Sequence, residues 1–114
     1  MRLKSELLTA LERDGWTVNR HEGEGTHLSW FQEVWEIESR WSPHGFKLFL
    51  TFCLMEQVSP YSFWAIGTSL RFPDNATDAS GEPMLVMSPN WSEELPQFVA
   101  KLNAHRDTFS QRNV

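Results

Sequence analysis

Residues 46–55 form an apolar run, Phe-Lys-Leu-Phe-Leu-Thr-Phe-Cys-Leu-Met, that limits the possible folds more than any other part of the sequence. A β-strand directs alternate side chains to opposite faces of its sheet. One face of this run carries five apolar residues, and the opposite face also carries Phe49, Cys53 and Met55. Apolar groups on both faces predict a central strand that is covered on both sides.

Periodicity elsewhere predicts a helix at each end of the chain, with strands between them. Leucines at helical spacing predict a first helix over residues 2–14, which Gly15 ends. The last helix is expected to begin at Asn90 or nearer Ser92, with Pro96 in its first turn, where proline is tolerated. The expected strands are residues 16–20, 30–41, 46–55, 61–72 and 84–87.

The segment 30–41 also fits a helical stripe, because Trp30, Val34, Ile37 and Trp41 recur at helical spacing. We interpret it as a strand, since aromatic and β-branched residues are enriched in it and a turn signal follows. The order α-β-β-β-β-β-α with short connections then favours an antiparallel meander. The sequence therefore predicts a single α+β domain over residues 1–114, a two-layer sandwich of about five antiparallel strands with both terminal helices on one face.

Two helices cover only one face of such a sheet. The opposite face would then still carry Phe49, Cys53 and Phe63, or else the row of Trp35, Ile37 and Trp41. Soluble monomers rarely expose a large apolar patch. We expect a twofold homodimer to bury this face, since a second copy is the commonest partner. The competing solution is cover by the 73–83 loop and the 21–27 turn of the same chain.

The charge balance disfavours several classes of partner. Lys and Arg number 10 against 15 Asp and Glu, a net charge of −5, and the cations are scattered along the chain. Nucleic-acid and anionic-membrane binding both depend on clustered positive charge, so neither is expected. A basic partner protein is compatible with the acidity. The chain shows neither a signal-peptide pattern nor an apolar run approaching about 20 residues, so we expect a cytoplasmic protein.

The residues that could hold a metal lack the required spacing. His21, Glu22, Glu24 and His27 do not match H-E-x-x-H, and glycines intervene, so we interpret them as a solvated turn. The acidic loop from Asp74 to Glu82 lacks the alternating oxygens of a calcium loop. Cys53 is the single cysteine and reads as a small buried hydrophobe. We expect no metal, no cofactor and no catalytic residue.

Five of the six candidate binding residues come from the strand predicted over residues 30–41, and Phe63 comes from the strand predicted over residues 61–72. Glu36, Glu38 and Arg40 alternate onto one face of it, and carboxylates two apart on a strand lie about 6–7 Å apart, a separation that suits acid–base work on a glycoside. A solvated row with a local ion pair is the plainer interpretation. Tryptophan, with six copies, mostly fills the core but also anchors interfaces. The candidate binding residues are Trp35, Trp41, Glu36, Glu38, Arg40 and Phe63.

These observations favour a small, non-enzymatic protein-binding or adaptor module that forms a homodimer or binds another protein. The alternative is a small-molecule or carbohydrate-binding domain, or an enzyme, that uses the Glu36/Glu38/Arg40 face and nearby aromatic residues. An adaptor should present a flat apolar patch without a deep pocket. A ligand-binding domain or enzyme should present a concave site where carboxylates or histidines converge.

Overall fold

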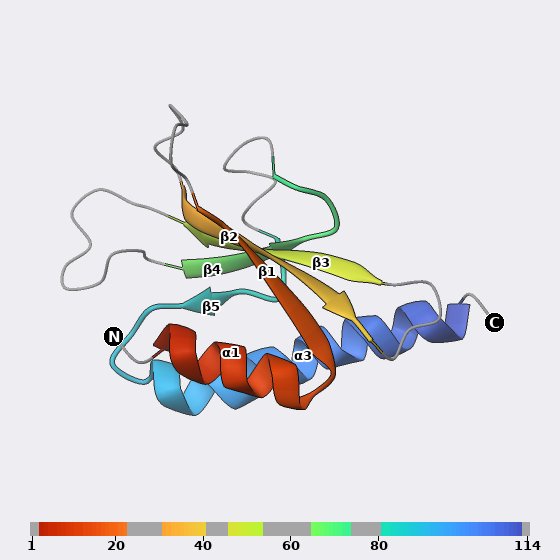
Figure 1. Cartoon of the computed structure of the whole chain (residues 1–114). Helices are drawn as coiled ribbons and strands as arrows, with labels where there is room; N and C mark the ends of the chain where they lie inside the picture. Colours follow the sequence, from red (N-terminus) through yellow and green to blue (C-terminus); the bar gives the residue numbers. More distant parts are fainter. Residues whose placement is uncertain (1–2, 23–30, 41–45, 54–64, 74–80, 113–114) are drawn as a thin grey trace.

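The computed structural model describes residues 3–22, 31–40, 46–53, 65–73 and 81–112 (Figure 1). Helices α1 (Leu3–Arg13) and α3 (Trp91–Arg112) lie at the two ends of the chain. Between them run strands β1 (Trp16–Glu22), β2 (Phe31–Ser39), β3 (Lys47–Cys53), β4 (Ala65–Ser69) and β5 (Leu85–Val86). They form one five-stranded sheet in the order β1-β2-β3-β4-β5, and each neighbouring pair is antiparallel. The predicted α+β meander is therefore confirmed.

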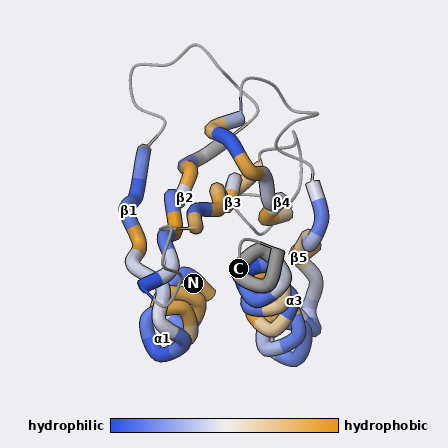
Figure 2. The backbone as a smooth tube through the Cα atoms, turned by 90° about the vertical axis from the view of Figure 1, so that its right-hand side faces the viewer, coloured by the Kyte–Doolittle hydropathy of each residue, from blue (hydrophilic) through white to orange (hydrophobic). Residues whose placement is uncertain are grey.

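Both helices lie on the same face of the sheet, and the apolar core fills the space between the two layers (Figure 2). In α1 the buried side chains are Leu3, Leu7 and Leu11, whose spacing places them on one helix face. In α3 the buried apolar side chains include Leu95, Phe98, Val99 and Leu102. The strands contribute Trp16, Trp35, Ile37, Leu48, Leu50, Phe52, Ile66 and Leu85, and Phe46 and Met87 join the core from positions next to β3 and β5.

Strand β3 is the centre of the sheet, as its apolar pattern predicts. Leu50 lies opposite Trp35 of β2 and Thr68 of β4, so these three side chains share the face that packs against the helices. The neighbouring residues Phe49 and Thr51 therefore face the other way. We call the face without helices the outer face.

The dimer prediction assumed that the outer face is apolar and uncovered, and the structure shows that part of this face is covered. Val34, Thr51, Cys53 and Ala65 belong to this face by register, and all four are buried. Phe72, which follows β4, packs edge-on against Phe49 with ring centroids 5.9 Å apart. Within the described residues the chain thus supplies part of its own cover, and the homodimer through this face stays a prediction.

The helix ends follow the sequence with one exception. Gly15 has a φ of 89° directly after α1, where glycine adopts the left-handed conformation without a steric penalty. Helix α3 begins at Trp91, so Pro96 is its sixth residue and lies beyond the first turn that we expected. Pro96 removes one main-chain donor, and the carbonyl left without it belongs to Ser92, which is exposed to water. In the described residues, no helix has both the length and the apolar character needed to cross a membrane.

A buried ion cluster lies on the helix side of the sheet, centred on Glu33. This carboxylate is 3% exposed and contacts the Lys4 ammonium at 2.6 Å and the Arg20 guanidinium at 3.1 Å. Lys4 also lies over the Phe52 ring, and Arg20 lies over the Trp35 ring. Burial raises the pKa of Glu33, but the hydrogen bonds of its neighbours, with that of Lys4 the largest, and the charge of Lys4 lower it by more, so the net pKa is below its ordinary value.

Candidate functional site

The structure brings Glu36 and Glu38 to the outer face of β2, where the Glu36 carboxylate joins two basic side chains. Its Oε1 lies 3.4 Å from His21 Nε2 of β1, and its Oε2 lies 3.4 Å from Lys47 Nζ of β3. The His21 ring in turn meets the Phe72 ring edge-on at 5.8 Å. This arrangement matches the plainer interpretation of the row, an ion pair on a solvent-facing sheet surface.

The other predicted binding residues are not gathered there. Trp35 is fully buried on the opposite face, where its ring packs 4.9 Å from the Phe52 ring. The Arg40 guanidinium donates to the carbonyl oxygen of Glu12 at 3.2 Å, a contact that satisfies the carboxyl end of α1 rather than the Glu36 face. Trp41 and Phe63 lie outside the described residues. Of the predicted set, the described structure therefore joins only Glu36 and Glu38.

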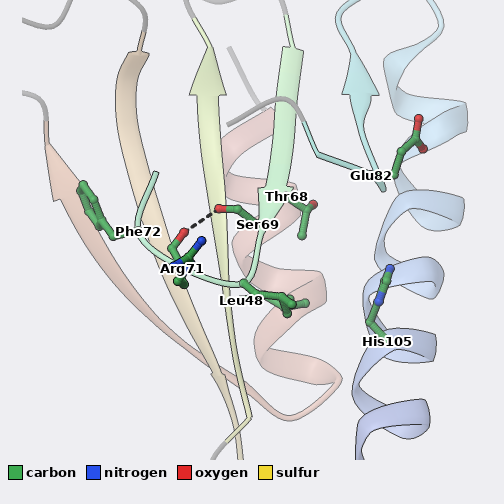
Figure 3. Close-up of a pocket in the computed structure, with 8 residues that line it drawn as sticks. Leu48, Thr68, Ser69, Arg71, Phe72, Glu82 and His105 are labelled. Atoms are coloured by element: carbon green, nitrogen blue, oxygen red, sulfur yellow. Dashed lines mark hydrogen bonds between the residues drawn. The ribbon is translucent and has the colours of Figure 1, made fainter. Parts of the chain in front are cut away.

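A concave site occurs elsewhere, between the end of β4 and helix α3 (Figure 3). One hollow of about 460 Å³ is lined by residues of β3, β4, the segment 70–72, Glu82 and His105. A second hollow of about 570 Å³ runs further along α3 past Lys101 and Thr108. Both hollows share Leu70, Glu82 and His105, so they form one continuous depression, the β4–α3 groove.

The floor of the groove is apolar and belongs to the core. Phe46 and Leu48 form part of it, and both belong to the buried core. Thr68 at the end of β4 donates from its main-chain N–H to the Gly81 carbonyl at 2.9 Å and from its Oγ1 to the Pro83 carbonyl at 2.7 Å. These two bonds fix the segment 81–83 beside β4 and so place Glu82 at the groove.

Gly81 is required at this junction. A Cβ atom built on Gly81 would collide with the carbonyl oxygen of Thr68, so the backbones approach more closely than any side chain permits. The position is therefore part of what holds the groove in shape.

Helix α3 supplies the other wall. Lys101, His105 and Thr108 are spaced at i, i+4 and i+7, which places them on one helix face, and all three are exposed. Figure 3 shows His105 and Glu82 on the α3 side of the hollow and Leu48 and Thr68 on the sheet side.

A polar junction on the neighbouring face of α3 fixes the position of this wall. Asn103 accepts a hydrogen bond from the Trp16 indole at 2.8 Å and donates one to Asp14 at 2.8 Å. The buried Arg106 donates to the Asp14 carbonyl at 2.7 Å, and its guanidinium lies over the Trp16 ring. The Asn103 hydrogen bond is the largest influence on the pKa of Asp14, which lies below its ordinary value.

The rim of the groove combines an exposed apolar side chain with mixed charge. Leu70 is 70% exposed, the largest exposed fraction among the large apolar side chains in the described part of the chain. Arg71 and Lys101 contribute two permanent positive charges, and Glu82 contributes one negative charge. Sequence reasoning missed this site because it placed residue 70 within a longer strand, 61–72, and had no pattern that connects this residue with Glu82 and His105.

The described residues offer little for metal or thiol chemistry. They contain no group of three or more His, Cys, Asp or Glu side chains placed to hold a metal ion. Glu24, His27, Asp74 and Asp78 lie outside the described residues. Cys53 is buried, as predicted, and burial raises the pKa of its thiol, which disfavours the reactive thiolate.

Comparison with known proteins identifies no relative of this chain. No family model matches the chain, and neither a curated protein nor a solved structure matches it significantly. A functional conclusion therefore rests on the site itself.

Proposed function

We propose that the protein is a non-enzymatic binding module that holds a short segment of a partner protein in the β4–α3 groove. The observation that carries this proposal is a continuous depression with a buried apolar floor, an exposed leucine at its mouth and a charged rim. Interfaces are typically built in this way, with an apolar centre that a partner side chain fills and a polar rim around it.

The charges of the rim indicate the chemistry of the occupant. The chain as a whole carries a net charge of −5, yet the groove has Arg71 and Lys101 against a single acid, Glu82. A local excess of positive charge on an acidic protein favours a partner segment with acidic residues on either side of an apolar side chain. A basic partner, which the overall net charge suggested, would be repelled by the excess of positive charge on this rim.

The exposure of the titratable groups favours recognition over catalysis. Glu82 and His105 are the acid and the imidazole of the groove, and both are exposed to solvent. Acid–base catalysts are commonly found where burial tunes their protonation, and these two side chains lack that burial. The alternative site on the outer face keeps Glu36 and Glu38 but lacks Trp35 and Arg40, which lie elsewhere.

A binding assay with two defined peptide pools tests the proposal. Both pools are fluorescein-labelled nonapeptides with a fixed central Leu, which is flanked by Asp in the acidic pool and by Lys in the basic pool. We expect fluorescence anisotropy to show about tenfold tighter binding of the acidic pool, a difference of about 1.4 kcal/mol. Lys101→Glu should remove this preference, because it reverses one charge on the rim.

The matched control is Lys47→Glu, the same charge reversal at an exposed lysine of the outer face. It should leave both affinities unchanged. Equal binding of the two pools, or a loss of binding with Lys47→Glu but not with Lys101→Glu, would contradict the proposal. Hollows of this size also hold small ligands. Saturable binding of uncharged small-molecule fragments in the groove, without binding of either peptide pool, would favour a small-molecule site instead.

A further inference from the structure

Strand β1 is one edge of the sheet, and its outward backbone groups can be identified from the register. The Arg40 N–H donates to the Gly15 carbonyl, and these two residues lie opposite each other in the extension of the β1–β2 ladder. Hydrogen-bonded pairs alternate along an antiparallel ladder, so Thr17, Asn19 and His21 bond to β2. The N–H and C=O groups of Trp16, Val18 and Arg20 therefore point away from the sheet.

This edge is accessible, and Arg20, the charged side chain that it turns toward the helix layer, is paired with Glu33. Thr17, Asn19 and Arg20 are exposed, and no described segment continues the sheet beyond β1 (Figure 2). The strand keeps a continuous register with β2 over seven residues and contains no proline. A long, regular edge of this kind is a template for pairing with another strand.

The sequence of β1 allows it to pair with itself in one complete register. If Asn19 lies opposite Asn19 of a second copy, Val18 lies opposite Arg20, and Thr17 lies opposite His21. All seven residues of each strand are then paired, and no two like charges face each other. Moving the twofold axis by one residue shifts the register by two and centres the pairing on Arg20, where two guanidinium groups oppose each other, or on Val18. Either shift leaves two residues at one end of each strand unpaired.

We infer that two copies of this chain associate through β1, so that their two five-stranded sheets become one continuous sheet. The association is antiparallel and twofold, the commonest symmetry for a pair of identical chains. Both helical layers then lie on the same side of the joined sheet, and the two copies of α1, which lies beneath β1, come side by side (Figure 2). The inference does not depend on the β4–α3 groove, and it moves the homodimer from the outer face to the sheet edge.

A single cysteine tests both the surface and the register. In the proposed pairing Asn19 lies opposite its own copy in a pair without mutual hydrogen bonds, where Cα atoms are about 4.5 Å apart, a distance that a disulfide can span. Asn19→Cys should form a covalent dimer on mild oxidation at least tenfold faster than Thr17→Cys. The Thr17 positions of the two copies would be about 13 Å apart, four residues along the strand.

The native Cys53 is buried, so the unsubstituted chain provides the background rate. Cross-linking of Asn19→Cys no faster than that of Thr17→Cys overturns the inference. Faster cross-linking of Phe49→Cys would place the interface on the outer face and overturn it as well.

Sedimentation velocity gives an independent measurement. The unsubstituted chain should sediment at twice its mass of 13.3 kDa at about 100 µM, and it should shift toward monomer on dilution. Val18→Pro should be monomeric with an unchanged circular dichroism spectrum, because it removes an outward N–H and spares the ladder to β2. A chain that stays at 13.3 kDa at every concentration overturns the inference.

Discussion

The buried carboxylate of Glu33 gives the sharpest prediction for stability. Glu33→Gln keeps the shape of the side chain and removes the charge that pairs with Lys4 and Arg20. Breaking a buried ion pair from one side typically costs about 3–5 kcal/mol. The side chains of Lys4 and Arg20 are 27% and 47% exposed, so both cations recover part of their hydration. We therefore expect a loss of about 2–3 kcal/mol in the free energy of unfolding at pH 7.

The pH dependence of this loss follows from the lowered pKa of Glu33. A carboxyl group whose pKa is lower in the folded state stabilises the fold above its unfolded pKa, which is near 4.5. That contribution disappears as the pH falls through the folded pKa. The difference between the unsubstituted chain and Glu33→Gln should therefore shrink when urea denaturation, followed by tryptophan fluorescence, is moved from pH 7 to about pH 2.5.

The matched control is Glu38→Gln, on the outer face of the same strand. This substitution should cost less than about 1 kcal/mol, as expected for a charge near solvent. Equal losses for Glu33→Gln and Glu38→Gln at pH 7, or a Glu33→Gln difference that grows toward low pH, would refute the argument that Glu33 is a buried structural charge.

The remaining predictions concern the core, the groove and metals. Leu50→Ala and Phe98→Ala should each lower the free energy of unfolding by about 2–5 kcal/mol in chemical denaturation, because both side chains are buried between sheet and helices. Losses below about 1 kcal/mol at both positions would place them outside the core. Gly81→Ala should lower the melting temperature and weaken peptide binding together, since its Cβ would collide with the Thr68 carbonyl; an unchanged melting temperature would contradict the close approach. EDTA should leave the melting temperature unchanged, and a sharp fall would revive the metal hypothesis for His21 and His27, although His21 lies in β1 and not in the turn that the sequence predicted.

The fold was largely predictable because its determinants are local. The alternation in residues 46–55 identifies the central strand β3, and short connections favour the observed meander. The leucine spacing identifies α1, and Gly15 identifies its end. Pro96 was harder to place, because the exposed side of a helix tolerates the loss of one main-chain hydrogen bond beyond the first turn.

The predicted binding face failed to assemble for a geometric reason. Trp35 and Glu36 are neighbours in a strand, so they point to opposite faces, and burial in the core takes the tryptophan away from the carboxylate. Arg40 alternates with Glu36 and Glu38, but it lies beyond the end of β2, where its side chain reaches the end of α1. The alternation of side chains between the two faces of a sheet can be relied on only within the strand, and β2 ends at Ser39.

Other features could not be predicted because they depend on contacts between distant segments. The sequence alone does not distinguish Glu33 from an ordinary surface carboxylate, because its partners Lys4 and Arg20 come from other elements of the fold. The β4–α3 groove combines residues near position 70 with Glu82 and His105, and no local pattern connects them. Sequence spacing carries no information about such a junction.

The proposed groove is tested most directly by an NMR titration of the ¹⁵N-labelled chain with the acidic peptide pool. The proposal predicts that the largest changes in amide chemical shift occur around the β4–α3 groove, at Thr68, Leu70, Glu82, Lys101 and His105. Changes of that size at Glu36 and Lys47 instead, or no saturable change at any amide, would contradict it.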